Sequence, residues 1–510
     1  MQLINHFTNH LKADNLETNH VRLVKNACFS FVNPTPTKKP KMIHLNEDFL
    51  RSFDMEKEDY HSQDFLKLMT GNTLPKDAKP YAMCYGGHQF GHWAGQLGDG
   101  RAINLGEILK NNEAWTVQLK GAGKTPYSRK GDGLAVLRSS IREYLCSEAM
   151  HYLGIPTTRV FSLALTGDEV LRDMLYDGNA NYEKGAIVSR VAPSFLRFGS
   201  FQIHAANQET DLLKQLLDYV IINHYQHLGQ PSKEVYIAFV DELAKKTIDL
   251  VVEWERVGFV HGVLNTDNLS ILGLTIDFGP YGWVEDYNRD WTPNTSDSEH
   301  RYAFGEQINV AFWNIYQLLN ALYPAIEEAE PLQKVMDDLP NYYDQKRKEM
   351  FGRKLGLEAE LVKPLINPLI GNLENSQLDM TLFFRQLISF DGDFEEYLPL
   401  LKSSSYVKNF DPYIANWKTW FEDYQHTKNT SNIDNHLGMM RLANPKYIFR
   451  NYMAQLAIEA AEKDDFSLVN TFFILLKNPY DEQPEYEQWF AKRPDWALNK
   501  VGCSALSCSS

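Results

Sequence analysis

Long apolar runs are missing from this sequence. No stretch of its 510 residues approaches the ~18 to 20 consecutive apolar residues that a membrane-spanning helix needs. The start of the chain, MQLINHFTNHLKADNLETNH, lacks the basic and apolar regions of a secretion signal. Asp14 and Glu17 argue against a mitochondrial presequence. We therefore expect a cytoplasmic protein.

Cysteine and positive charge are also scarce. The five cysteines include no CxxC pair, which fits a reducing compartment and gives no metal-binding framework. The net charge of −15 disfavours binding to nucleic acid or to anionic membranes. The hydrophobic fraction of 44% and the charged fraction of 23% are those of an ordinary soluble globular protein. Function must therefore be sought in local motifs.

The segment HGVLNTDNLSILGLTIDFG, residues 261–279, matches the active-site pattern of kinases except at one position. His261, Asn268 and Asp277 stand where kinases have the His, the Asn and the Asp of Asp-Phe-Gly. Val263 stands where the catalytic Asp is expected, and its side chain cannot accept a proton. Asn268 and Asp277 offer hard oxygen ligands, which suit a Mg²⁺ ion (or Mn²⁺) that bridges phosphates.

Asp267, directly before Asn268, is a carboxylate in the same loop. It could accept the proton of a hydroxyl nucleophile that approaches from another direction. Alternatively, it caps the turn in a nucleotide-binding protein without catalytic activity. The residues alone leave both interpretations open.

Lys120 ends a predicted strand, AWTVQLKG, in which Trp115, Val117 and Leu119 share the opposite, apolar face. Kinases place a lysine here to bind ATP phosphates and to pair with a glutamate from the following helix. Glu143 and Glu148 are the candidates, and their five-residue spacing allows only one of them to face Lys120.

Two glycine-containing segments are candidate phosphate-binding turns. LGDGR, residues 97–101, predicts either a phosphate-cradling turn or the plain turn of a β-hairpin over residues 95–107. KGDG, residues 130–133, precedes a predicted helix, and the structural alternative there is that Asp132 is the N-cap of that helix.

The pattern along the chain divides it into four parts. Residues 1–90 show few periodic stretches and predict an irregular N-terminal extension. Strands predominate over residues 91–205, whereas residues 206–430 are mainly helical and residues 431–510 form a further helical region with a cysteine-containing tail. With Asp-Phe-Gly close to the junction, this order predicts an α+β fold of the two-lobed protein-kinase type, with a β-rich N-lobe and a helical C-lobe.

Four motifs resemble the selenoprotein O family, and the resemblance runs over most of the chain. They are YGGHQFGHWAGQLGDGRA (85–102), QLKGAGKTPYSRKGDGLAVLRSSIREYLCSEAM (118–150), HGVLNTDNLSILGLTIDFGPYGW (261–283) and NPKYIFRNYMAQLAIEAAEKDDFS (444–467). The resemblance implies a pseudokinase-like enzyme that transfers AMP from ATP to hydroxyl side chains (Ser, Thr or Tyr) of proteins. It also implies that ATP binds in reversed orientation, so that the α-phosphate faces the acceptor.

The resemblance also implies roles for single residues. Asp267 becomes the proton acceptor, Asn268 and Asp277 hold the metal, and Glu143 is the partner of Lys120. The implied nucleotide contacts are Gly98, Gly100, Arg101, Lys120, Asp132, Gly133, Arg190, Arg197 and Asp277. Three alternatives remain open: transfer of UMP instead of AMP, a true kinase that uses Asp267, and a non-catalytic ATP-binding scaffold.

The cysteines depart from the family pattern. Some bacterial members are thought to pair a cysteine after Asp-Phe-Gly with one near the C-terminus, but residues 280–304 contain no cysteine here. Cys503 and Cys508 lie in a tail of small residues that we expect to be exposed and mobile. Their spacing predicts that mild oxidation joins them to each other or forms a mixed disulfide.

Overall fold

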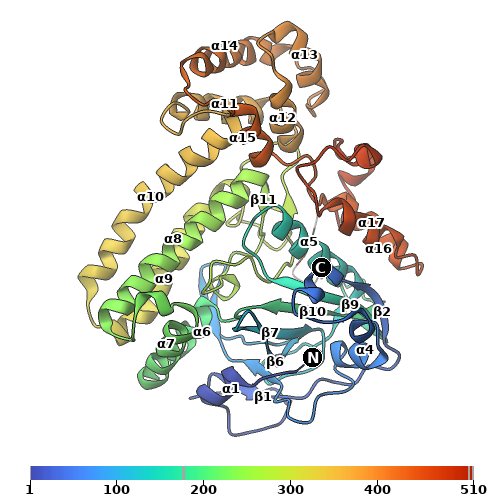
Figure 1. Ribbon diagram of the computed structural model, residues 1–510, viewed down its shortest axis with the longest axis vertical. Helices are drawn as coiled ribbons and strands as arrows, with labels where there is room; N and C mark the ends of the chain where they lie inside the picture. The colour runs from blue at the N-terminus through green and yellow to red at the C-terminus, as the bar shows by residue number, and fades with distance from the viewer. Residues whose placement is uncertain (1, 175–177, 504–505, 508–510) are drawn as a thin grey trace.

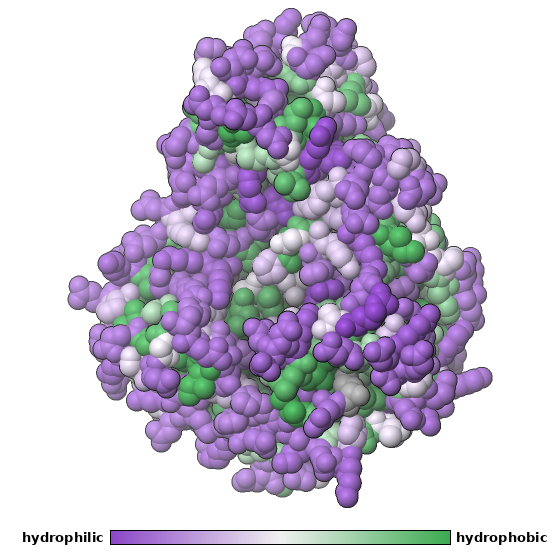
Figure 2. All heavy atoms as spheres, in the orientation of Figure 1, coloured by the Kyte–Doolittle hydropathy of each residue, from purple (hydrophilic) through white to green (hydrophobic). Residues whose placement is uncertain are grey.

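The computed structural model describes residues 2–174, 178–503, 506 and 507. A β-sheet lies at one end of the molecule, long helices run along its side, and a group of shorter helices forms the other end (Figure 1). The protein is therefore of the α+β class, as the sequence predicts. Over the described residues, no helix has the length and apolar character that a membrane crossing requires. The face in Figure 2 is mostly hydrophilic, with apolar side chains in small separate groups.

The main sheet contains eight strands within the described residues, seven of them in the order β1-β3-β6-β7-β10-β9-β2, while β8 pairs with β10. All of these pairings are antiparallel. The strands are β1 (Phe29–Phe31), β2 (Lys41–Leu45), β3 (Tyr81–Met83), β6 (Ala102–Lys110), β7 (Glu113–Lys120), β8 (Ala135–Val136), β9 (Arg159–Arg172) and β10 (Asn181–Ala192).

Strand β7 has the two faces that the alternation predicts. Val117 and Leu119 are fully buried in one hydrophobic cluster, and Trp115 packs against the same cluster. Lys120 lies on the opposite face, toward helix α5 (Leu137–Tyr152), which packs on β9 and β10. The period of two therefore determines which face of the sheet carries the charged groups.

The first ninety residues are more ordered than the predicted irregular extension. They supply β1, β2 and β3 to the main sheet. Four short helices accompany these strands: α1 (His6–His10), α2 (Glu47–Arg51), α3 (Lys57–Tyr60) and α4 (Gln63–Met69). Phe49 and Met69 pack in the same hydrophobic cluster as Val117 and Leu119, so this segment covers the face of the sheet that lies opposite α5. Short strands without a strong alternating pattern hid this role.

The predicted hairpin over residues 95–107 is wrong. β5 (His92–Gln96) pairs with β4 (Gly86–Gln89) in a separate two-stranded sheet, whereas β6 pairs with β3 and β7. The turn at residues 97–101 therefore links two different sheets. Glycines favour a sharp turn in either case, and the pairing partners lie too far away in sequence for a local pattern to identify them.

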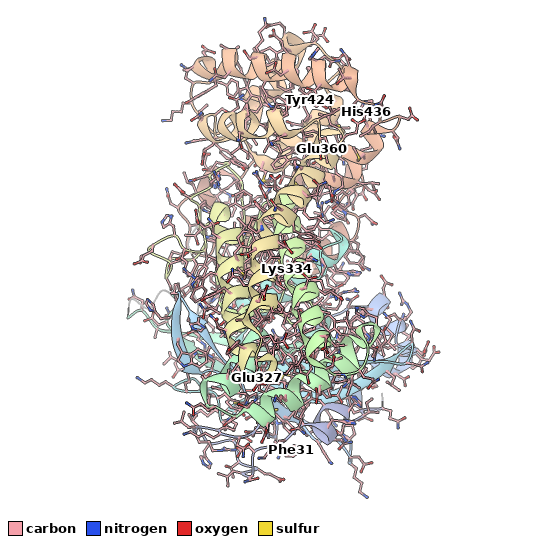
Figure 3. All side chains as sticks on the ribbon, turned by 90° about the vertical axis from the view of Figure 1, so that its left-hand side faces the viewer. Phe31, Glu327, Lys334, Glu360, Tyr424 and His436 are labelled. Carbon is pink, nitrogen blue, oxygen red and sulfur yellow. The ribbon has the colours of Figure 1, made fainter. Side chains whose placement is uncertain are left out.

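Helices dominate after β10. They begin with α6 (Phe198–Ala206), α7 (Thr210–His224), α8 (Lys233–Val257), α9 (Gln307–Ile326) and α10 (Ala329–Leu355). Gly258 ends α8 in the left-handed conformation at φ +76°, as its position in the sequence predicts. Helices α8, α9 and α10 pack side by side, and Figure 3 follows α10 from Glu327, just before its start, to Glu360, just past its end.

The remaining helices form the far end of the molecule and then return to the sheet. They are α11 (Lys363–Asn375), α12 (Met380–Gln386), α13 (Phe394–Ser403), α14 (Ile414–Thr430), α15 (His436–Ala443), α16 (Asn451–Ala461) and α17 (Ser467–Leu475). Helices α11 to α14 lie farthest from the sheet, whereas α16 and α17 pack against α5 (Figure 1). The C-terminal region thus supports the helix that carries Glu143.

The tail is not the loose segment that its small residues predict, as far as it is described. Cys503 is 3% exposed and Leu506 is fully buried. The backbone N–H of Leu506 donates to the oxygen of Pro293 at 3.0 Å, and its oxygen accepts from Thr295 at 2.7 Å. Long-range backbone hydrogen bonds hold the tail, and composition does not reveal them. Cys508 lies outside the described residues, so its predicted bridge to Cys503 stays a prediction.

Candidate active site

Three cationic side chains converge on one carboxylate between the sheet and the helices. Lys120 Nζ lies 2.7 Å from Glu143 Oε2 and 3.8 Å from Asp277 Oδ1. Arg190 Nη1 lies 2.9 Å from Glu143 Oε1 and 2.5 Å from Asp277 Oδ1. Arg197 Nη1 forms an ion pair with Asp277 Oδ2. We refer to these five residues as the charge cluster.

The sheet register explains how residues distant in sequence meet. In the pairing of β7 with β10, Lys120 lies opposite Val188 and Gln118 lies opposite Arg190. The Gln118 side chain accepts a hydrogen bond from Arg190, which holds the guanidinium against the face that carries Lys120. Gln118 is a member of the site that the motifs did not indicate. Its position two residues before Lys120, on the same face of the strand, was the available signal.

Helix α5 resolves the choice between the two glutamates. Glu143 is 2% exposed and contacts both Lys120 and Arg190. Glu148, equally buried, forms a 2.7 Å ion pair with Arg159 at the start of β9. The two carboxylates therefore serve different parts of the sheet.

Asp277 is held in an unusual backbone conformation, at φ +56°, which residues other than glycine rarely adopt. Burial alone would raise the pKa of Asp277, but the charges of Arg197, Arg190 and Lys120 outweigh it and keep this pKa well below its usual value. Burial also lowers the pKa of Lys120 to about 8, against the opposing effect of Glu143. The cluster therefore holds an ionised carboxylate among closely spaced cations.

The loop before Asp-Phe-Gly is anchored by its histidine and its asparagine. Nε2 of buried His261 donates to the oxygen of Ile276 at 2.9 Å, and burial lowers the pKa of His261, so the ring is neutral at pH 7. Asn268 Nδ2 donates to the oxygen of Val263 at 2.8 Å. Because the amide nitrogen of Asn268 is used in this way, its Oδ1 is the atom left to bind a ligand.

Asp267 lies in the short helical turn η2 (Thr266–Asn268), beside the charge cluster. Its backbone oxygen accepts a 2.8 Å hydrogen bond from Arg197, the same guanidinium that contacts Asp277. The side chain is 7% exposed, and burial raises the pKa of Asp267 to about 6. A carboxylate with this pKa is suited to accept a proton near neutral pH.

The turn at residues 97–101 packs closely against Tyr127. A Cβ at Gly98 would lie 2.3 Å from the ring of Tyr127, and one at Gly100 would lie 2.9 Å from the oxygen of Tyr127. Arg101, partly exposed, stands next to Ala102, which pairs with Lys120. Between the glycines, buried Asp99 lies 4.0 Å from Arg197, a contact that the motifs did not indicate.

Asp132 and Gly133 lie in a separate arrangement. Asp132 accepts two 2.7 Å hydrogen bonds from Arg172 of β9. It is not the N-cap of α5, because that helix begins at Leu137 with Val136 at the cap. A Cβ at Gly133, where φ is +76°, would lie 2.1 Å from the oxygen of Gly123. The segment thus packs closely on residues 123–124, and within the described residues no hydrogen bond or ion pair joins it to the charge cluster.

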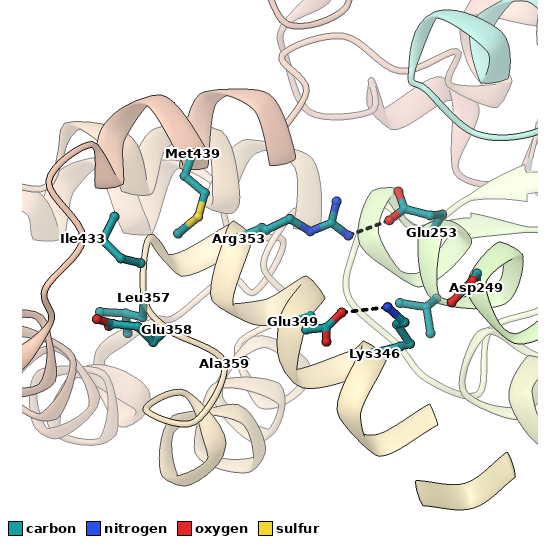
Figure 4. A pocket seen from close by; sticks show the side chains of 11 residues that line it. Asp249, Glu253, Lys346, Glu349, Arg353, Leu357, Glu358, Ala359, Ile433 and Met439 are labelled. Carbon is teal, nitrogen blue, oxygen red and sulfur yellow. Dashed lines mark hydrogen bonds and ion pairs between the residues drawn. The ribbon is translucent and has the colours of Figure 1, made fainter. Parts of the chain in front are cut away.

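Cavities elsewhere do not contain these residues. Figure 4 shows one of about 580 Å³ between α8 and α10, in which Arg353 pairs with Glu253 at 2.6 Å and Lys346 pairs with Glu349 at 3.0 Å. A neighbouring cavity of about 630 Å³ shares Glu253 and Arg353. None of the predicted site residues lines either cavity, so the charge cluster remains the candidate active site.

Comparison with known proteins identifies relatives over the whole chain. The family described as "Protein adenylyltransferase SelO" matches residues 13–477. A protein of Flavobacterium johnsoniae named "Protein nucleotidyltransferase YdiU" is 53% identical over 519 residues, covering 100% of this chain and 99% of the relative. Proteins with the same name from Rhodopirellula baltica and Azoarcus sp. are each 46% identical, and the matches cover at least 98% of each chain.

Proposed function

The chain belongs to the protein adenylyltransferase SelO family and is a protein nucleotidyltransferase, and on that premise we propose that it transfers AMP from ATP to Ser, Thr or Tyr hydroxyls of acceptor proteins. The observation that carries this proposal is the convergence of Lys120, Arg190 and Arg197 on Asp277, directly beside Asp267. Three clustered cations are suited to a polyanion, and a buried carboxylate next to them is suited to take a proton.

The arginines favour pyrophosphate as the leaving group. A guanidinium binds phosphate oxygens in a planar, bidentate manner and spreads the charge that develops when a phosphate leaves. We infer that Lys120, Arg190 and Arg197 hold the β- and γ-phosphates, which directs the α-phosphate toward Asp267. This orientation of ATP is the reverse of that in kinases. In this orientation the reaction needs no proton acceptor at position 263, where the chain has valine.

The proposed chemical step is an in-line displacement at the α-phosphorus. The acceptor hydroxyl oxygen attacks this atom, its proton passes to the Asp267 carboxylate, and the bond to the bridging α–β oxygen breaks. The electron pair of that bond leaves with pyrophosphate. Arg197 contacts both the Asp277 carboxylate and the backbone of Asp267, so one side chain links the leaving-group site to the base.

The residues present also fit a divalent cation such as Mg²⁺ or Mn²⁺. Asn268 Oδ1 and the Asp277 carboxylate are hard oxygen donors, and Mg²⁺ sites in nucleotide enzymes take few protein ligands and complete the shell with phosphates and water. Within the described residues, no three His, Cys, Asp or Glu side chains form a metal site of their own. When bound, such an ion neutralises phosphate charge and orients the nucleotide.

We further propose that the two structural regions correspond to kinase-like lobes, residues 91–205 and 206–430. The support is the position of the charge cluster. Lys120, Glu143 and Arg190 come from β7, α5 and β10, Arg197 directly precedes α6, and Asp277 belongs to Asp-Phe-Gly. Gly98, Gly100 and Arg101 adjoin the end of β7 in this arrangement, whereas Asp132 and Gly133 would approach a bound nucleotide from the loop before α5.

Differentially labelled nucleotides test the proposal. Purified protein and cell lysate are incubated with ATP labelled at the α-phosphate, with ATP labelled at the γ-phosphate, and with UTP labelled at the α-phosphate. The proposal expects protein labelling from α-labelled ATP. Stronger labelling from UTP would indicate that the protein transfers UMP instead of AMP. Labelling from the γ-phosphate of ATP would indicate a kinase, and no labelling would indicate a non-catalytic binding scaffold.

A further inference from the structure

The Asp267 carboxylate lies against the hairpin formed by β4 and β5. Gln89, the last residue of β4, donates from Nε2 to Asp267 Oδ2 at 3.3 Å. In the described part of the chain, Gln89 is the only side chain that donates a hydrogen bond to this carboxylate, and Oδ1 has no partner. The orientation of Asp267 therefore depends on one neighbouring amide.

Both chain neighbours of Gln89 are fixed to the loop that carries Asp267. The backbone N–H of His88 donates to Thr266 Oγ1 at 2.7 Å. The backbone N–H of Phe90 donates at 2.8 Å to Tyr302 Oη, which in turn donates to the side chain of Asn265. The hairpin and the loop thus form one hydrogen-bonded unit, and Gln89 lies at its centre.

The turn of the hairpin has a demanding geometry. Gln89 pairs with His92, and the two residues between them have positive φ, +50° for Phe90 and +82° for Gly91. This combination is that of a type I′ turn. A phenylalanine in the left-handed region is strained, so the surrounding contacts must hold it there.

Gly87 lets the hairpin approach Asp267 from the other side. A Cβ at this position would lie 2.8 Å from Asp267 Oδ1 and 2.9 Å from its Cβ. The carboxylate is therefore confined between the backbone at Gly87 and the amide of Gln89. Rotation of the carboxylate about the Cβ–Cγ bond of Asp267 would break the hydrogen bond from Gln89.

We propose that Gln89 is a positioning residue that fixes the Asp267 carboxylate for proton transfer. This inference rests on the proposed role of Asp267 as the base. A neutral amide suits the task, because it orients the carboxylate through Oδ2 and brings no positive charge that would weaken the base. Oδ1, which is buried and has no hydrogen-bond partner, then keeps its lone pairs unengaged.

A double-mutant cycle tests the proposal. Gln89→Met keeps the size of the side chain and removes the donor. The rate of label transfer from α-labelled ATP to a fixed amount of cell lysate is measured at saturating ATP, together with ATP affinity and the thermal midpoint. We expect the rate to fall roughly tenfold, a part of the ~10² to 10⁴ that a base contributes, with the other two quantities unchanged. In an Asp267→Ala background, Gln89→Met should change the residual rate less than about twofold.

A control variant and the contrary outcomes distinguish failure of the role proposed for Gln89 from failure of the role proposed for Asp267. His92→Ala alters the exposed residue opposite Gln89 and should keep the wild-type rate. An equal fall in both backgrounds would show a structural role and overturn the proposal, as would a wild-type rate for Gln89→Met when Asp267→Ala is impaired. A wild-type rate for Asp267→Ala would refute the base itself, and the role of Gln89 with it.

Discussion

The carboxylate of Glu143 lies 2.7 Å from the ammonium of Lys120, in a buried ion pair that joins α5 to the end of β7. The second oxygen of Glu143 accepts from Arg190 at 2.9 Å, so one side chain orients two of the three cations of the charge cluster. Because all of these groups are buried, removing one of them leaves an uncompensated charge.

Glu143→Gln should therefore weaken both stability and nucleotide binding. We expect a loss of about 2–4 kcal/mol in the free energy of unfolding and roughly tenfold weaker ATP binding, since Lys120 and Arg190 lose their common partner. Denaturant titration and calorimetry measure the two effects. Glu148→Gln is the matched control: it breaks the equally buried pair with Arg159 and should lower stability while leaving ATP affinity intact. Equal ATP binding by both variants would contradict the assignment.

Asp277→Asn separates metal-dependent from metal-independent binding. The carboxylate is both a proposed metal ligand and the anion that pairs with Lys120, Arg190 and Arg197. We expect transfer to be abolished and the gain in ATP affinity from added Mg²⁺ to disappear. Binding in the presence of a chelator should stay or strengthen, because the three cations become free for phosphate. Isothermal titration with and without Mg²⁺ is the measurement, and a retained Mg²⁺ effect would exclude Asp277 as a ligand.

Asp267→Ala should slow transfer by ~10² to 10⁴ and leave ATP affinity within a few-fold of the wild-type value. The reason is that Asp267 contacts the charge cluster through its backbone oxygen, which alanine keeps. Single-turnover rates and ATP affinity are compared on the same preparations. If affinity collapsed while the remaining chemistry stayed normal, Asp267 would be a ligand instead of a base.

Val263→Asp restores the residue that kinases have, and we expect it not to create an efficient kinase. The proposed orientation of ATP depends on Lys120, Arg190 and Arg197, and this substitution leaves all three unchanged. The assay is label transfer from the γ-phosphate of ATP, with the wild-type protein beside it. Strong γ-phosphate transfer would refute the reversed orientation.

Glu107 predicts a pH dependence of stability away from the site. Burial raises the pKa of Glu107 to about 7, from 4.5 as its ordinary value, although the N–H groups of His6 and Phe7 partly oppose this. The folded state thus binds a proton more tightly than the unfolded state. Protonated Glu107 therefore contributes to the free energy of unfolding. This contribution is fully present below pH 4.5 and is lost as the pH rises through 7.

Glu107→Gln should remove this dependence. Between pH 5 and pH 8, we expect the wild-type protein to lose on the order of 3 kcal/mol relative to the variant. Urea titrations at several pH values measure the difference. Glu113→Gln, an exposed position at the start of β7, is the control. Parallel curves for wild type and Glu107→Gln would contradict the prediction.

Local patterns predicted the elements that carry the site. The alternation in β7 predicted a strand with Lys120 opposite an apolar face, and Gly258 predicted the end of α8. These signals are local, because a strand face or a helix end depends on the residues within a few positions of it. Spacing alone narrowed the partner of Lys120 to Glu143 or Glu148, the family resemblance selected Glu143, and the fold places Glu143 at Lys120.

The partners of several residues could not be predicted from the sequence, because they lie far away along the chain. Asp132 pairs with Arg172, forty residues later in the chain, and Asp99 approaches Arg197 across nearly a hundred residues. Buried Cys503 is held in the same way, since its backbone oxygen accepts from Asn451. No periodic pattern encodes such contacts, because they depend on how complete elements pack.

β2 is an edge strand of the main sheet and pairs with β9, and this pairing has a consequence for synthesis of the protein. β2 leaves the ribosome at residues 41–45, but its partner in β9 follows more than a hundred residues later. At ~5–20 residues per second, β2 waits roughly 6–25 seconds for that partner. During this time its hydrogen-bonding groups are unpaired, so the nascent chain passes through a period of aggregation risk in which chaperones can act.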